Sequence, residues 1–235
     1  MISHKHKCIF IHISKCAGSS IEKAFDIDVF SNATQNNKNF FGWSEKNKLF
    51  LQHATPQQLF DCEYLNYDIW DNYYKFIVVR NPYSRMMSDY FWISKTNNII
   101  DTFENFILKK GKYYSLLNNN STPDFRGDHL NSQYSYFQLN NKIINYDAVI
   151  SFEDFNTGIL KLNIKNELKE KILNNKINKS GHNMFHYSHF YNFNRKKIVE
   201  RIYNEDIKFL NYHFENKHNF KSYIKAQLPS VYFLK

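Results

Sequence analysis

A short apolar run, followed at once by a tight polar loop and a helix, stands near the start of the sequence. Residues 8–13 read CIFIHI, a nearly continuous apolar stretch of the kind that forms a buried parallel strand. The polar loop 14–18 follows, and Ile21, Ala24 and Phe25 then recur at helical spacing, after a serine that we expect to be the helix N-cap. This order of strand, loop and helix points to a fold built on a parallel sheet.

Two further apolar runs repeat this pattern later in the chain. Residues 74–80 and 148–152 are each followed by a helical pattern, the first through the cap Asn81-Pro82. Strands that alternate with helices predict an α/β fold with a central parallel sheet flanked by helices. Glycine (6) and proline (4) are too scarce for a linker, so we expect a single domain over residues 1–235. Helices are also expected from Thr55-Pro56 onward and over 102–110 and 196–210, the last with a core-facing stripe at Ile198, Ile202, Ile207 and Leu210.

Basic residues outnumber acidic ones by 31 to 22, which gives a formal net charge of +9. Such a charge favours anionic partners, among them nucleotides, acidic glycans, nucleic acids and membrane surfaces, without choosing between them. The three cysteines are an odd number without zinc spacing, so they predict neither a disulfide framework nor a metal site. Three histidines at helical spacing have no glutamate among them, so we expect no metal there either: His182, His186 and His189.

The sequence contains no apolar segment approaching the roughly 20 residues that span a bilayer. Its basic first residues are followed only by the short run 8–13, whereas a secretory signal needs a longer apolar stretch and a cleavage site. We therefore expect a soluble cytoplasmic protein. A domain cut from a membrane-anchored parent is the alternative.

The loop at residues 14–20 has the composition of an anion site. A strand-to-helix turn presents backbone N–H groups and the positive end of the helix dipole. Gly18 permits close approach of the backbone, Ser19 and Ser20 add hydroxyl donors, and Lys15 adds a mobile positive charge. The lysine precedes the glycine, so the loop is not the usual NTPase signature. An ordinary loop with N-capping serines explains the same residues equally well.

A second group of anion-binding side chains follows the strand at residues 74–80. Arg80 stands at the carboxyl end of that strand, where α/β proteins bind ligands. Ser88 lies eight residues later, two turns into the following helix, so the two side chains are expected to converge on one anion. The alternative is that Arg85 and Ser88 are solvated residues of the helix surface.

These segments resemble the donor-binding motifs of sulfotransferases that use PAPS, 3′-phosphoadenosine 5′-phosphosulfate. Residues 9–22 are similar to the 5′-phosphosulfate loop of that family, and residues 76–85 to its 3′-phosphate motif. The closest group is the carbohydrate sulfotransferases related to heparan 2-O- and chondroitin enzymes. The loop departs from the commoner Pro-Lys-Thr-Gly-Gly-Thr form at Ser14, Cys16 and Ala17. Further matches follow in the same order along the chain, at 52–55, His129, 133–137, 147–154, 178–180 and 203–206.

The resemblance implies a P-loop-like three-layer fold and an enzyme that moves the sulfuryl group of PAPS to a hydroxyl, leaving PAP. Lys15 would contact the bridging oxygen of the phosphosulfate and stabilise charge on the leaving phosphate. Arg80 and Ser88 would hold the 3′-phosphate, and Lys179 and Ser180 would belong to a loop that closes over the nucleotide. The 5′-phosphate would be held by the amides and hydroxyls of Cys16, Ala17, Gly18, Ser19 and Ser20.

Sulfuryl transfer needs a base for the acceptor proton and stabilisation of the leaving phosphate, and no metal. His53 is the candidate base, because histidine ordinarily titrates near neutral pH and this one matches the family position before Ala-Thr. The alternative is a hydrogen-bonded structural histidine beside a helix cap. His129 is a second candidate, for substrate contact or proton transfer, and Arg126 and Gln133 stand close to it in sequence as candidates for acceptor binding.

Two other functions remain open on the sequence. A P-loop-type nucleotide kinase is one, although the chain lacks the Gly-Lys-Ser/Thr ending and a clear magnesium-binding acid after a strand. A non-catalytic anion- or glycan-binding protein of the same fold is the other. For the enzyme we expect a carbohydrate acceptor, for which an acidic polysaccharide suits the basic charge, and no nucleic-acid partner. The irregular stretches 26–50 and 111–137 are expected to select it.

Overall fold

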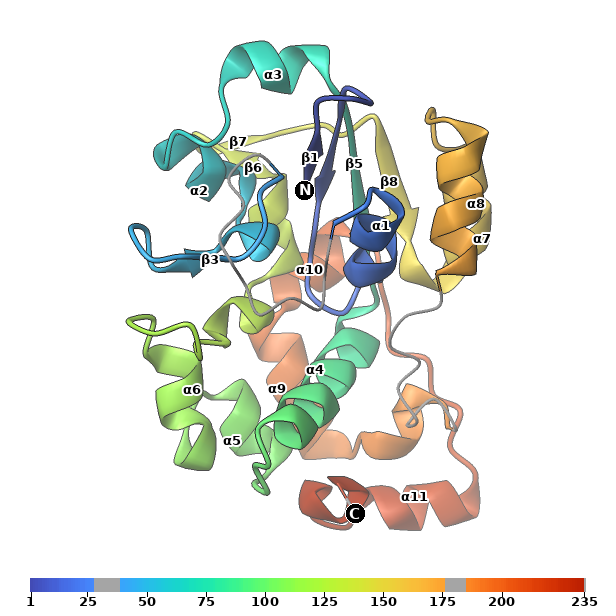
Figure 1. The fold of residues 1–235 in the computed structure, drawn as a ribbon. Coiled ribbons are helices and arrows are strands. Elements are labelled where there is room, and N and C mark those ends of the chain that lie inside the picture. Colours follow the sequence, from blue (N-terminus) through green and yellow to red (C-terminus); the bar gives the residue numbers. More distant parts are fainter. Residues whose placement is uncertain (28–38, 176–184, 235) are drawn as a thin grey trace. The chain divides into compact units, whose positions relative to one another are not determined.

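The computed structural model describes residues 1–27, 39–175 and 185–234 of the chain (Figure 1). The chain divides into two compact units, each assembled from three stretches. The single domain expected over residues 1–235 stays a prediction. Unit 1 comprises Met1–Arg80, Ser121–Pro123 and Gln133–Asn178, and unit 2 comprises Asn81–Asn120, Asp124–Ser132 and Lys179–Lys235.

Unit 1 is built on a four-stranded sheet in the order β1-β2-β5-β8. The short β1 (Ile2–Ser3) is antiparallel to β2 (Cys8–Ile11), whereas β2, β5 (Tyr74–Val79) and β8 (Ala148–Ser151) run parallel. The register sets Ile11 opposite Ile77. All of β2 and the last four residues of β5 are buried, which explains why both strands read as continuous apolar runs.

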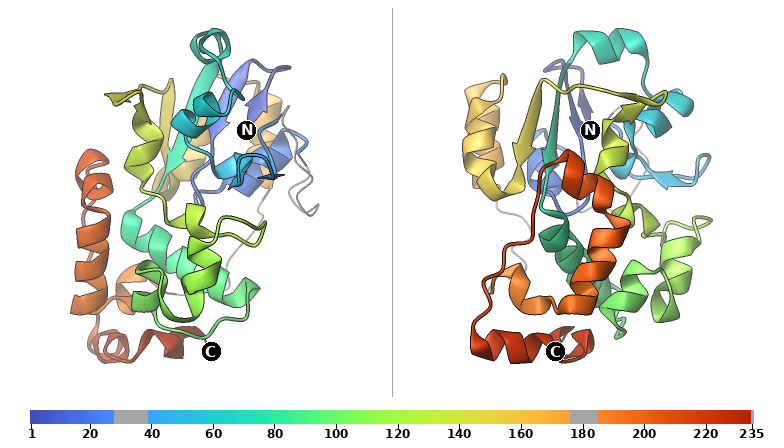
Figure 2. Two further views of the ribbon diagram at one scale, coloured as in Figure 1. Left: turned by 90° about the vertical axis from the view of Figure 1, so that its left-hand side faces the viewer. Right: turned by 180° about the vertical axis from the view of Figure 1, so that it is seen from behind.

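Helices flank this sheet within unit 1. α1 (Gly18–Ala24) packs against α8 (Asn166–Asn174), and α7 (Phe155–Lys161) packs against both α8 and β8, where Figure 2 shows α7 and α8 side by side. Ile21 of α1 and Ile159 of α7 are fully buried, and each such side chain contributes about 1.5–3 kcal/mol. The predicted central sheet of parallel strands flanked by helices is confirmed.

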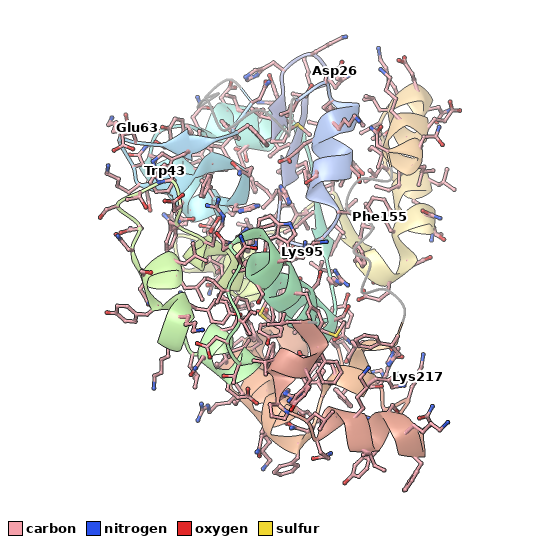
Figure 3. All side chains as sticks on the ribbon, turned by 60° about the horizontal axis from the view of Figure 1, so that its bottom comes forward. Asp26, Trp43, Glu63, Lys95, Phe155 and Lys217 are labelled. Atoms are coloured by element: carbon pink, nitrogen blue, oxygen red, sulfur yellow. The ribbon has the colours of Figure 1, made fainter. Side chains whose placement is uncertain are left out.

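Short elements complete unit 1. The hairpin of β3 (Trp43–Ser44) and β4 (Leu49–Phe50) sets the Trp43 ring, labelled in Figure 3, edge-on to the ring of Phe50, with 5.1 Å between centroids. Unit 1 also contains the helices α2 (Pro56–Asp61) and α3 (Tyr67–Asn72) and the paired strands β6 (Gln138–Leu139) and β7 (Lys142–Ile143).

Two of the predicted helix starts are confirmed by their caps, and one is wrong. Thr55 forms a capping box with Gln58 ahead of α2, and the Asn81 side chain accepts from the Tyr83 N–H at the start of the next helix. At α1, however, the N-cap is Ala17, without a side-chain hydrogen bond, and not a serine. The loop turns through a left-handed residue here, so Ser19 and Ser20 fall inside the first helical turn.

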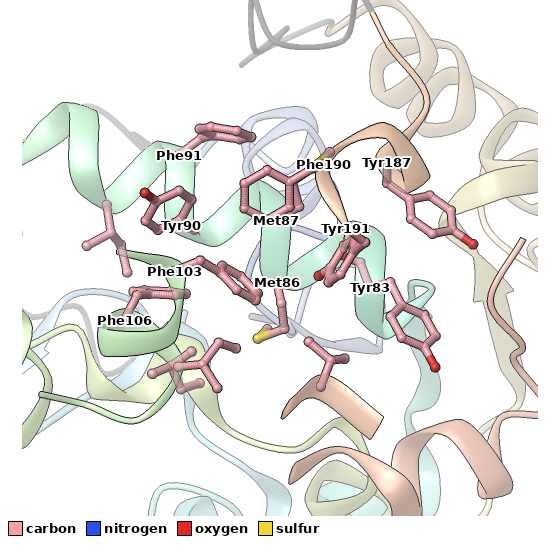
Figure 4. Close-up of a cluster of buried hydrophobic side chains, with 14 of the residues drawn as sticks. Tyr83, Met86, Met87, Tyr90, Phe91, Phe103, Phe106, Tyr187, Phe190 and Tyr191 are labelled. Carbon is pink, nitrogen blue, oxygen red and sulfur yellow. The ribbon is translucent and has the colours of Figure 1, made fainter. Parts of the chain in front are cut away.

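The described residues of unit 2 form helices around an aromatic core (Figure 4). α4 contributes Tyr83, Met86 and Tyr90 to this core, and the rings of Tyr90 and Phe190 lie 5.8 Å apart. None of the described helices is both long and apolar enough to cross a membrane. The α-helices in the described part of unit 2 are α4 (Pro82–Thr96), α5 (Phe103–Ile107), α6 (Tyr114–Asn118), α9 (Phe193–Ile202), α10 (Asn204–Phe209) and α11 (Phe220–Ala226).

The helix predicted over residues 196–210 is two helices, α9 and α10, which meet at Tyr203. The predicted core stripe is wrong at Ile202, which is exposed, whereas Ile198 and Ile207 pack half-buried against the core. The fully buried positions are Arg195, Val199, Tyr203 and Asp206. Arg195 donates to the Phe190 carbonyl at 2.6 Å, and Asp206 accepts from Ser132. Polar side chains that find partners inside the protein therefore occupy the buried face, and apolar periodicity does not detect them.

Candidate active site

The loop after β2 and the arginine after β5 lie at the same edge of the unit 1 sheet. β2 and β5 are parallel neighbours, so their carboxyl ends, at Ile11 and Val79, open on one side. The side chain of Arg80 reaches the loop, where its Nη1 donates to the Lys15 carbonyl oxygen at 2.9 Å. The structure thus brings together Lys15 and Arg80, at the edge where open α/β sheets bind ligands.

The loop holds two non-glycine residues in the left-handed region. Lys15 has φ 61° and Ala17 has φ 63°, a conformation that costs an ordinary side chain about 1–2 kcal/mol. The Cys16 amide donates to Ile13 O and the Ser20 amide to Ala17 O. By contrast, no protein acceptor in the described part of the chain receives the N–H groups of Ala17, Gly18 or Ser19. A turn with this conformation forms a concavity of amides suited to an anion.

Arg80 is held on several sides within unit 1. Its guanidinium lies 4.2 Å from the centre of the Phe152 ring. Its backbone N–H donates to Gln133 Oε1 at 2.9 Å, and Gln133 Nε2 donates back to the Arg80 carbonyl at 2.7 Å. Gln133 is fully buried, so the structure places this predicted acceptor-binding residue as a support for the Arg80 backbone.

His12 and Glu22 form a buried pair beneath the loop. His12 Nδ1 lies 2.9 Å from Glu22 Oε1, and both side chains are buried. In this pair Nδ1 of His12 donates when it carries the ring hydrogen, and the Glu22 carboxylate accepts. The opposite edge of the ring abuts Gly18, since a Cβ at position 18 would lie 1.9 Å from His12 Nε2. Glycine is therefore required at position 18 by the packing of His12.

His53 stands next to this pair. It ends the 3₁₀ helix Leu51–His53, and its backbone carbonyl accepts from the Tyr136 hydroxyl at 2.8 Å. The rings of His53 and His12 meet edge to face, with 4.8 Å between centroids and 83° between planes. The same His12 ring also touches Gly18 in the loop. The predicted base, His53, is therefore separated from the loop in space only by the ring of His12.

Unit 2 contains a second buried histidine–carboxylate pair. His129 Nδ1 lies 2.7 Å from Asp89 Oδ1, and the His129 ring stacks on Trp92 at 5.0 Å with 9° between planes. Arg85 places Nε 4.0 Å from Asp89 Oδ2, and its Nη2 donates to the carbonyls of His129 at 2.7 Å and Asn131 at 2.9 Å. Arg85 is fully buried, which excludes the alternative that it lies on a solvated helix surface.

A protein-family model described as "Sulfotransferase family" matches residues 1–213. The chain belongs to the sulfotransferase family. Searches of curated proteins and of solved structures returned no match. The match covers every site residue that the sequence predicts and ends before α11, which begins at Phe220. Membership of this family makes the chain a transferase that moves sulfuryl groups from a sulfate donor to an acceptor.

The other predicted site residues of this sulfotransferase lie in unit 2 or outside the described residues. Ser88 is half-buried on α4. Arg126 directly precedes the 3₁₀ helix Gly127–Leu130 that carries His129, and burial lowers the pKa of its guanidinium, against the opposing effect of Asp128 and Asp124. Lys179 and Ser180 fall outside the described residues.

Three residues that the structure places in these pairs were missed from the sequence: His12, Glu22 and Asp89. Glu22 follows Gly18 by four residues, and Asp89 follows Arg85 by four, so each sits one helical turn from a residue that the sequence had singled out. Both acids also stand beside core positions, Ile21 and Tyr90. A carboxylate on or beside the apolar face of a predicted helix is the signal that identifies such pairs.

Proposed function

We propose that this sulfotransferase uses PAPS as its donor and a hydroxyl group of a carbohydrate as its acceptor. The observation that carries the proposal is the contact between Arg80 and the Lys15 carbonyl, because it brings two cationic residues together at one edge of the sheet. PAPS presents two separate anionic groups, the 5′-phosphosulfate and the 3′-phosphate. One cation in the loop and a second one beside it match that pattern.

The cationic side chains, loop amides and loop hydroxyls of unit 1 each have a role in the proposed site. Lys15 contacts the bridging oxygen of the phosphosulfate, and Arg80 holds the 3′-phosphate with its guanidinium fork. The amides of Ala17, Gly18 and Ser19 hold the 5′-phosphate, supported by their lack of an acceptor in the described protein. The hydroxyls of Ser19 and Ser20 assist them.

The transfer itself exchanges one oxygen–sulfur bond for another. The acceptor oxygen forms a bond to sulfur as the bond from sulfur to the bridging oxygen breaks, and the electron pair of that bond remains on the phosphate of PAP. Lys15 stabilises this developing charge. The hydroxyl proton passes to His53, whose ring is packed against His12 and through it against the loop. The products are a sulfate ester, PAP and a protonated histidine.

The carbohydrate acceptor is inferred from two features of the sequence. The matching motifs resemble most closely those of the carbohydrate sulfotransferases, and the formal net charge of +9 suits an acidic polysaccharide. A panel of neutral and acidic polysaccharides, with simple alcohols and phenols beside them, tests the acceptor class. Sulfate incorporation into phenols alone would overturn the carbohydrate assignment and leave the donor chemistry intact.

The catalytic role of Lys15 is tested by transfer of labelled sulfate from PAPS. We expect Lys15→Ala to lower kcat by about 100- to 1,000-fold, because it removes a charge that acts on the leaving phosphate. Lys23→Ala is the matched control, since Lys23 is an exposed lysine of α1. A folded Lys15→Ala variant with the activity of the control would exclude this role. Tight PAP binding by the wild type without transfer to any acceptor would favour a non-catalytic binding protein.

The donor site is tested by comparing PAP with AMP, which lacks the 3′-phosphate. Arg80→Ala should weaken PAP binding by about 10- to 100-fold, the effect of losing a charged hydrogen bond, while changing AMP binding far less. A variant that weakens both nucleotides equally has a distorted loop, and Arg80 would then have no special role at the 3′-phosphate. Preference of the wild type for ATP–Mg²⁺ over PAP would instead support the nucleotide kinase.

A further inference from the structure

The imidazole of His12 bridges one turn of α1, a position that the proposed mechanism does not use. Gly18 and Glu22 lie four residues apart, about 6 Å along the helix axis. The Nδ1 edge of the ring meets Glu22 Oε1 at 2.9 Å, and the Nε2 edge fills the space that a side chain at position 18 would occupy. The ring therefore cannot shift along α1 without losing the hydrogen bond or striking the helix backbone.

The remaining surfaces of the His12 ring are set by two further aromatic rings. Phe10, in β2, stacks on it with 5.6 Å between centroids and 22° between planes. His53 meets it at 83°, with 4.8 Å between centroids. His12 thus links three parts of unit 1, namely the strand, the first turn of α1 and the 3₁₀ helix that ends at His53.

We propose that His12 and Glu22 are positioning residues of the sulfuryl transfer, which fix the position of the proton-accepting His53 relative to the donor loop. This inference rests on the proposed function. Glu22 sets the orientation of His12 through the hydrogen bond, and the His12 ring sets the distance between Gly18 and His53. Neither residue touches the reacting atoms in this account. Their contribution is geometric, because a displacement of about 1 Å at a reacting group can cost 100-fold in rate.

The test separates catalysis from donor binding. We expect His12→Ala to lower kcat at saturating PAPS by about 10- to 100-fold, while the Kd for PAP changes by less than about 3-fold. His4→Ala, an exposed histidine of the same unit, is the control and should change neither quantity. Calorimetric titration with PAP gives the Kd, and circular dichroism confirms that each variant is folded.

Glu22 provides an independent test if His12→Ala fails to fold. Glu22→Gln keeps an oxygen that accepts from His12 Nδ1, whereas Glu22→Ala removes it. We expect Glu22→Ala to lower kcat by about 10-fold or more and Glu22→Gln to retain most of it. The exposed Glu63, labelled in Figure 3, provides the control Glu63→Ala.

A pair of substitutions that moves bulk from position 12 to position 18 tests whether the contact between His12 and Gly18 affects only the shape of the loop. Gly18→Ala places a Cβ 1.9 Å from His12 Nε2, so we expect it to weaken PAP binding. The double variant His12→Ala/Gly18→Ala removes this clash and should recover PAP binding, yet keep the low kcat of His12→Ala. Recovery of kcat together with binding would overturn the positioning role and leave His12 as packing for the loop.

Failure of this inference differs from failure of the proposed function. A wild-type protein that transfers sulfate, with His12→Ala and Glu22→Ala at wild-type kcat, overturns the positioning role only. Equal losses of kcat and PAP affinity in both variants overturn it as well, because loop packing then explains the result. A wild-type protein that transfers no sulfate to any acceptor overturns the proposed function, and this inference with it.

Discussion

Each of the two units buries a histidine against a carboxylate, but the surroundings of the two pairs differ. In unit 1, His12 and Glu22 lie 2.9 Å apart, and the far edge of the imidazole is pressed against the helix backbone at Gly18. In unit 2, His129 and Asp89 lie 2.7 Å apart, and the guanidinium of Arg85 stands 4.0 Å from the same carboxylate. The first pair acts mainly through packing, and the second through charge.

The backbone that each pair supports also differs between the two units. Arg85, Asp89 and Trp92 lie on successive turns of α4, so one regular helix presents all three of these contacts to His129. His12 instead supports a loop in which Lys15 and Ala17 adopt positive φ. Strained backbone persists where the surrounding contacts over-determine it. The comparison teaches that one chemical pair stabilises a strained loop in unit 1 and neutralises a buried charge in unit 2.

The largest effect is expected at Asp89. Asp89→Ala removes the acceptor of His129 and leaves the buried guanidinium of Arg85 without this counter-charge, so we expect the free energy of unfolding to fall by about 3–5 kcal/mol. Urea denaturation measures this loss, with the exposed Asp124→Ala of the same unit as control. A loss below about 1 kcal/mol would mean that the charges of Arg85 and Asp89 contribute little to the free energy of unfolding.

A smaller loss is expected at Glu22. Glu22→Ala leaves the Nδ1–H of a buried imidazole without its acceptor, but it removes no counter-charge from a buried arginine. The free energy of unfolding should therefore fall by about 1–3 kcal/mol. Hydrogen exchange followed by mass spectrometry should show the loss of protection in peptides that cover α1. If Glu22→Ala proves as costly as Asp89→Ala, the distinction between packing and charge is wrong.

The smallest effect, and the only stabilising one, is expected at Ala17. Glycine tolerates φ 63°, so Ala17→Gly should relieve strain and raise the free energy of unfolding by about 0.5–1 kcal/mol after its entropic cost. The same substitution at Ala24, the buried last residue of α1, should lower it by about 1–2 kcal/mol, because the backbone gains freedom and a buried methyl group is lost. Urea denaturation of both variants checks the opposite signs. Destabilisation by Ala17→Gly would show that the loop carries no strain at this residue.

Local rules in the sequence determined the strands, the main helix starts and the position of the loop. The runs 8–13 and 74–80 are continuous and apolar because parallel strands of this kind are buried. Thr55 and Asn81 cap their helices because their side-chain oxygens accept the backbone N–H of Gln58 and Tyr83, and each precedes a proline at the first helical position. These signals lie within a few residues of one another, so the sequence alone shows them.

Only the tertiary structure decided which polar groups meet. Gln133 bonds to the Arg80 backbone across 53 residues, and His129 to Asp89 across 40. The pairing of His12 with Glu22 spans only 10 residues, yet it depends on α1 folding back beside the end of β2. Hydrophobic periodicity reports which face of a helix or strand is buried. It does not report the partner of a buried polar side chain, because that partner is set by how the elements pack.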